Sequence, residues 1–117
     1  FGGATKPRDP RPRYPQDDPK KTADIDVDAE GNVQPKIPPQ GASTFADVRF
    51  APLSGNYHAV PKTILDIHPA LKALADGADV GGTHAPTHHT IFPLFKMAFQ
   101  TFVTYFQSLP WVRAGKK

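Results

Sequence analysis

The sequence predicts a mostly irregular, Pro-rich, extended chain with a small β-hairpin and one or two α-helices, and no independent globular core. Fourteen prolines and nine glycines are spread through 117 residues, which leaves few stretches long enough for regular structure. Cysteine is absent, so neither a disulfide nor a cysteine-based metal site can reinforce a weak core. Only one long window shows helical periodicity, and it holds most of the aromatic residues. We therefore expect the chain to depend on a partner for burial and to be largely unfolded alone.

Residues 1–60 are expected to form an extended Pro-rich segment. Five prolines within residues 1–21 exclude a helix or a central strand there, so this part is either a solvated tail or a strap across a partner. Between residues 22 and 34, apolar side chains alternate with Asp and Glu and lead into Gly31-Asn32, which predicts a small hairpin. The same acidic residues match half of a calcium-binding loop. Because Ile37 stands where a bidentate Glu belongs, we prefer a solvated hairpin face.

The next two segments are expected to be a short helix and a linker. Residues 61–77 carry a narrow apolar stripe that ends at Gly77, a residue suited to the position after a helix. Residues 78–92 form a His/Gly linker, whose imidazoles are weak candidates for a metal site: His84, His88 and His89. Pro86 lies inside the helical spacing that a metal-binding histidine pair would need, so a polar loop is the preferred interpretation.

Residues 93–110 are predicted to form one amphipathic, Phe-rich helix, followed by a basic tail over residues 111–117. Pro93 suits the first turn of a helix and Pro110 ends it. The residues expected to contact a partner or a membrane lie on its apolar side or just beyond it: Phe95, Phe99, Phe102, Phe106, Leu109 and Trp111. About 17 helical residues span only about 25 Å, short of the roughly 30 Å hydrocarbon core of a bilayer. We therefore expect this helix to lie along a surface.

The functional class follows from absent motifs and from these surface features. The chain has no phosphate-binding loop, no nucleophile elbow and no thiol, so it is not expected to be an enzyme or to carry a cofactor. We expect a structural accessory subunit that stabilises a large organellar membrane complex by wrapping its partner subunits. A mitochondrial respiratory-chain or ATP synthase complex is the preferred setting. The alternatives are a peripheral protein of an organellar ribosome and, ranked last, a small His-based metal-binding protein.

The expected location is the mitochondrial inner membrane, in a peripheral position, with the chloroplast thylakoid as the alternative. Trp111 and the basic residues after it are of the kinds that a membrane interface favours, and lipid head groups are possible ligands of Arg113, Lys116 and Lys117. The net charge of +3 is modest, which makes nucleic acid an unlikely partner. The choice of organelle rests on association with similar strap-like subunits.

Overall fold

A three-stranded antiparallel sheet is the largest regular element of the computed structural model, which describes residues 7–36, 40–45, 56–75 and 88–116. Its central strand is β7 (His88–Pro93), which pairs with β4 (Ala42–Phe45) on one side and with β6 (Leu71–Ala75) on the other. Thr90, Ile91 and Phe92 are β-branched or aromatic, the residue types that strands favour. Pairing on both sides leaves Ile91 almost fully buried.

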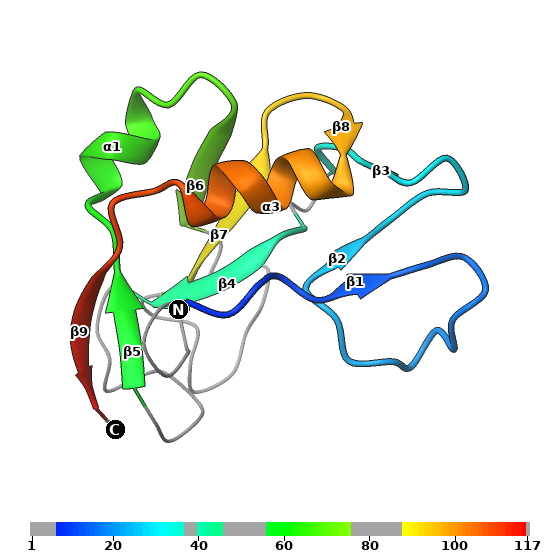
Figure 1. Ribbon diagram of the computed structural model, residues 1–117, viewed down its shortest axis with the longest axis horizontal. Coiled ribbons are helices and arrows are strands. Elements are labelled where there is room, and N and C mark those ends of the chain that lie inside the picture. The colour runs from blue at the N-terminus through cyan, green and yellow to red at the C-terminus, as the bar shows by residue number, and fades with distance from the viewer. Residues whose placement is uncertain (1–6, 37–39, 46–55, 76–87, 117) are drawn as a thin grey trace.

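Three smaller sheets surround this one (Figure 1). The short strands β1 (Pro12–Arg13) and β2 (Ile25–Asp26) are parallel neighbours. The equally short strands β3 (Asn32–Val33) and β8 (Met97–Ala98) pair antiparallel. Strand β5 (Asn56–Ala59) pairs antiparallel with β9 (Val112–Lys116), so the expected basic tail is largely a strand.

Two α-helices occur among the described residues, α1 (Lys62–Asp66) and α3 (Phe99–Gln107). Phe102 and Phe106 of α3 belong to one hydrophobic cluster with side chains of the sheet and of β2, β3 and α1. At Gly41, an added Cβ would overlap the backbone carbonyl of Ile91, so this close approach of β4 to β7 requires glycine.

The expectation of an extended chain without its own core is wrong, although the low content of regular structure is as predicted. The radius of gyration is 13.6 Å, close to the roughly 13 Å of a folded chain of this length. The fully buried side chains include Phe102, Phe106, Leu71 and Ile91, which come from a helix and two strands. Apolar residues scattered along the sequence therefore meet in one core.

Two of the expected helices are shorter than predicted because strands replace part of each. Within residues 61–77, only Lys62–Asp66 is helical, and Leu71–Ala75 is the strand β6. Within residues 93–110, the helix begins at Phe99, after β7, a turn and β8. The linker expected over residues 78–92 ends in β7, while residues 78–87 lie outside the described part of the chain.

The predicted hairpin over residues 22–34 is correct in its turn and wrong in its strand pairing. The amide of Gly31 donates to the carbonyl of Asp28 at 3.0 Å, and Gly31 has a φ of 83°, which glycine adopts readily. The strands on either side of the turn pair with β1 and β8 instead of with each other. The turn therefore connects two separate small sheets.

Candidate functional site

The Phe-rich side of α3 faces the chain's own core. Phe102 and Phe106 are fully buried, and Leu109 is nearly so. Phe99 is partly buried against the same cluster. These residues were expected to contact a partner or a membrane, and the structure instead places them against other parts of the same chain.

Trp111 is partly buried in the fold, whereas Phe95 is largely exposed. The indole of Trp111 lies 5.0 Å from the ring of Phe106 and donates a hydrogen bond to the Phe106 carbonyl at 2.8 Å. Trp111 is therefore partly buried in the fold. Phe95 precedes the helix and keeps half of its surface exposed. Of the expected contact residues, Phe95 is the one that the structure leaves largely open.

The histidines proposed as weak metal candidates lie only partly within the described residues. His84 lies outside them, and only the backbone of His88 is described, as the first residue of β7. His89 is partly buried in the same strand, where its carbonyl accepts a hydrogen bond from the Thr44 hydroxyl. Among the described residues, no three His, Cys, Asp or Glu side chains are placed to hold one metal ion.

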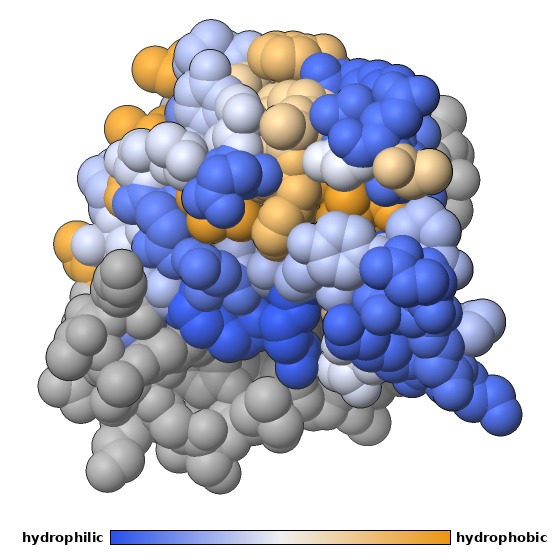
Figure 2. Space-filling view, turned by 45° about the vertical axis from the view of Figure 1, so that its right-hand side comes forward, coloured by the Kyte–Doolittle hydropathy of each residue, from blue (hydrophilic) through white to orange (hydrophobic). Residues whose placement is uncertain are grey.

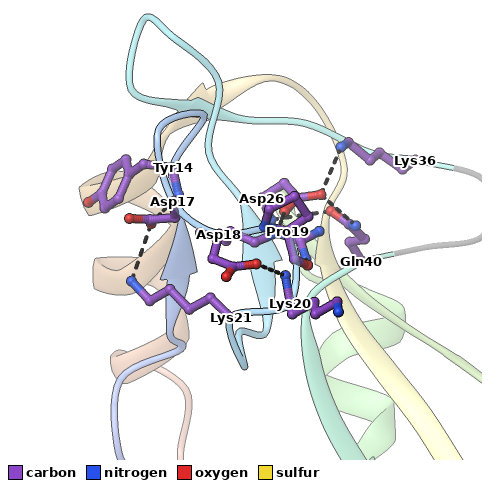
Figure 3. A network of polar contacts seen from close by, with 10 residues as sticks. Tyr14, Asp17, Asp18, Pro19, Lys20, Lys21, Asp26, Lys36 and Gln40 are labelled. Carbon is purple, nitrogen blue, oxygen red and sulfur yellow. Dashed lines mark hydrogen bonds and ion pairs between the residues drawn. The ribbon is translucent and has the colours of Figure 1, made fainter.

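The acidic residues of the calcium-like motif bind groups of the chain itself. Asp26 accepts hydrogen bonds from the Arg13 guanidinium at 2.6 Å and from the Gln40 amide at 2.9 Å (Figure 3). Asp28 Oδ1 accepts from the backbone amides of Glu30 and Asn32, each at 2.9 Å. Asp28 therefore fixes a turn, and Asp26 joins neighbouring segments of the chain.

The same network fixes the Arg/Pro-rich N-terminal segment. Arg8 and Arg11 approach the largely buried carboxylate of Asp24 at 2.8 and 3.6 Å, and the amide of Arg11 also donates to it. Close by, Asp17 accepts from the amide of Tyr14 and pairs with Lys21 at 3.2 Å (Figure 3). The acidic partners of these arginines therefore come from the chain itself.

The pKa values of these carboxyl groups follow from the same contacts. The hydrogen bond from Arg13 is the main reason why the pKa of Asp26 is lowered to about 2. The backbone amide of Asn32 is the main cause of the lowered pKa of Asp28, and that of Tyr14 of the lowered pKa of Asp17. Each carboxylate is held in its charged form by donors within the fold, which is typical of structural roles.

A separate group of exposed apolar side chains forms the candidate binding surface, which we call the apolar edge: Ile67, Leu94 and Phe95. Their exposed fractions are 81%, 40% and 50%, respectively. Ile67 ends α1, whereas Leu94 and Phe95 form the turn between β7 and β8. The two connections lie along the upper rim of the molecule in Figure 1, and the amide of Leu94 donates to the carbonyl of Ala70 at 2.9 Å. Apolar side chains reach the same rim in the space-filling view (Figure 2).

Charged groups border the apolar edge on two sides. In α1, Lys62 and Asp66 pair at 3.0 Å. After the β7–β8 turn, Lys96 lies 3.9 Å from Asp28 and 3.8 Å from Glu30. Around the β7–β8 turn, one lysine thus stands against two carboxylates, so these three residues carry one net negative charge.

The sequence contained a partial signal for this surface. Phe95 was identified, but it was placed on a helix with the buried phenylalanines. Ile67 and Leu94 are not among the residues expected to make contacts, although each lies within two residues of a proline, Pro69 or Pro93. An apolar residue close to a proline is the feature that could have indicated exposure.

No helix among the described residues has both the length and the apolar character that crossing a bilayer would need. Comparison of the chain with family models, with curated proteins and with solved structures finds no match.

Proposed function

We propose that this chain is a non-catalytic accessory subunit that docks onto another protein of a large organellar membrane complex through the apolar edge. One observation carries the proposal. Phe95 and its neighbours are exposed, while Phe102 and Phe106, only a few residues later, are fully buried. Exposed large apolar side chains grouped on a small protein are typical of an interaction surface.

The charges around the apolar edge favour a protein partner over a lipid surface. Glu30 is well exposed and stands beside the only positive group of the β7–β8 turn, Lys96. The net negative charge of Lys96, Asp28 and Glu30 beside this turn would be repelled by anionic lipid head groups. It suits a partner with an apolar pocket and basic groups at the rim, because opposite charges guide association and fix its register.

The manner of binding that we propose differs from the wrapping expected from the sequence. An extended strap would use its aromatic residues one at a time in pockets of the partner. Here the chain's own core takes up Phe102 and Phe106, so the subunit would dock as a folded unit. The proposed interface is therefore small and centred on Phe95. This agrees with the general finding that a few residues supply most of the binding energy of an interface.

The location is proposed on sequence features alone. We propose the mitochondrial inner membrane, in a peripheral position, with the thylakoid as the alternative. Trp111 adds less to this than expected because it packs on Phe106. The alternative of a ribosomal protein is less favoured. The three arginines of the N-terminal segment lie close to carboxylates of the chain itself, which makes them less available to RNA: Arg8 and Arg11 to Asp24, and Arg13 to Asp26.

The proposal is tested by changing Leu94 and Phe95 together to Ser in the full chain, produced in its native cells. Leu74→Ser is the matched control, because Leu74 is 42% exposed in β6 and does not belong to the apolar edge. Native electrophoresis of a mild detergent extract should show the wild type and the control in the same large assembly. The double variant should migrate alone, with an unchanged circular dichroism spectrum.

Two outcomes would count against the proposal. If the folded double variant remains in the assembly, the apolar edge is not the docking surface. If the wild type, but not the double variant, co-sediments with vesicles of anionic phospholipid in the absence of other proteins, the apolar edge binds lipid and the protein-docking proposal fails.

A further inference from the structure

His68 holds the connection between α1 and β6 through two hydrogen bonds from the backbone. Its Nδ1 accepts from the amide of Ala70 and from the amide of Leu71, each at 3.0 Å. Both donors belong to buried residues. An imidazole nitrogen that accepts hydrogen bonds carries no proton, so the geometry requires the neutral tautomer with its proton on Nε2.

Protonation would remove both hydrogen bonds at once. The second proton of an imidazole goes to Nδ1, which would then be a donor facing two N–H groups. Histidine is the side chain whose unperturbed change of charge falls between pH 5 and 8. The amides of Ala70 and Leu71 would lose their acceptor inside the fold, which is costly for buried polar groups.

The hydrogen bonds of His68 are connected to the apolar edge. Ile67 directly precedes His68, and the carbonyl of Ala70 accepts from the amide of Leu94 at 2.9 Å. The backbone between Ile67 and Leu71 therefore positions one member of the apolar edge directly and another through a single hydrogen bond. A change at His68 would reach both connections that form this surface.

The surroundings of His68 contain few ionisable groups. The Tyr105 ring of α3 meets the imidazole edge to face, with ring centroids 5.7 Å apart. The other ionisable residues of the adjoining elements are Lys62 and Asp66 in α1, which pair with each other, and Lys72 in β6. The β7–β8 turn adds Lys96, which lies near Asp28 and Glu30.

We propose that His68 is a proton-sensitive lock that orders the α1–β6 connection and the β7–β8 turn when its imidazole is neutral, and releases them when it is protonated. The lock itself is independent of the proposed function. Only its consequence, weaker docking through the apolar edge at acidic pH, rests on that function.

The test compares the full wild-type chain with His68→Asn by nuclear magnetic resonance at pH 7.5 and pH 5.0. Asn is the matched control because its side-chain oxygen can accept from the amide two residues later, as His68 does, and does not titrate. In the wild type, the protection factors of the Leu71 and Leu94 amides should fall roughly tenfold or more at pH 5.0, as expected from losing two net hydrogen bonds. In His68→Asn they should change less than about twofold. The other four histidines remain in both proteins, so any effect of theirs is common to the two.

Imidazole nitrogen shifts of the wild type give a second readout, which does not depend on any variant folding. At pH 7.5 they should show an unprotonated Nδ1 at His68. A proton on Nδ1 of His68 at pH 7.5 would contradict the proposal. An equal loss of amide protection in the wild type and in His68→Asn would contradict it as well. If the lock holds and partner binding in the assembly assay is nevertheless independent of pH, only its link to docking fails.

Discussion

At the scale of single residues, Asp26 joins more parts of the chain than any other carboxylate described above. It accepts from Arg13 in β1 and from Gln40 just before β4, and it lies 3.5 Å from Lys36. Its backbone amide donates in return to the Gln40 side chain at 3.2 Å. The N-terminal segment is therefore attached to β2, and β2 to the chain that leads into the main sheet.

We predict that Asp26→Asn lowers the free energy of unfolding by about 1–2 kcal/mol at pH 7, allowing for partial solvent screening. The pKa of Asp26 is about 2 in the folded state, below the ordinary value of 3.8, so the charged carboxylate stabilises the fold. This contribution is complete above about pH 4 and is lost as the pH falls through 2. The difference between wild type and variant in urea unfolding should therefore shrink as the pH falls from 4 towards 2 and be small below pH 2.

Asp66→Asn provides the control for this prediction. Asp66 also pairs with a lysine, but its side chain is exposed and its partner lies one helical turn away. Such surface pairs contribute at most about 0.5 kcal/mol. Equal effects of the two substitutions at pH 7 would show that the Asp26 network has no special role in stability.

At the scale of elements, substitutions of the aromatic residues in α3 and just before it test most clearly which of them belong to the core. Phe102→Ala should lower the free energy of unfolding by about 3–5 kcal/mol, because the side chain is fully buried and leaves a cavity. Phe95→Ala should change it by less than about 1 kcal/mol, because half of that side chain is already in water. Chemical denaturation of both purified variants provides the measurement. Similar small effects of both would place Phe102 outside the core.

Some of these elements could be predicted from the sequence because their signals are local. The turn at Gly31 follows from the conformational freedom of glycine. The apolar side of α3 follows from helical periodicity, since Phe102 and Phe106 are one turn apart and are both buried. The alternation around Ile25 and Val27 likewise appears as buried and less buried positions.

Other elements depend on contacts between distant residues, which local patterns do not contain. Leu71–Ala75 has good helix-forming residues, yet it is a strand because β7 pairs with it and buries Leu71 and Ala73. Pro93 likewise pairs with β6, so it ends the strand β7 instead of opening a helix. The candidate surface was only partly predictable, since the exposure of Ile67 and Leu94 follows from where these pairings end.

At the scale of the whole molecule, the two ends of the chain stabilise each other. The Gln107 side chain, at the end of α3, donates to the carbonyl of Pro7 and to the carboxylate of Asp9, each at 2.9 Å. Pro7 and Pro10 are among the fully buried residues. These prolines, which suggested an extended strap, are thus buried within the fold, and the arginines between and after them pair with Asp24 and Asp26.

The central claim is that this chain forms its own core, around α3 and the three-stranded sheet. Amide hydrogen exchange on the purified, isolated chain tests it most directly. We predict slow exchange, lost in one cooperative transition on heating, for the helical amides of Phe102 and Phe106 and for that of Ile91 in the central strand. Exchange of these amides at the rates of an unstructured peptide, without such a transition, would contradict the account and restore the partner-dependent chain expected from composition.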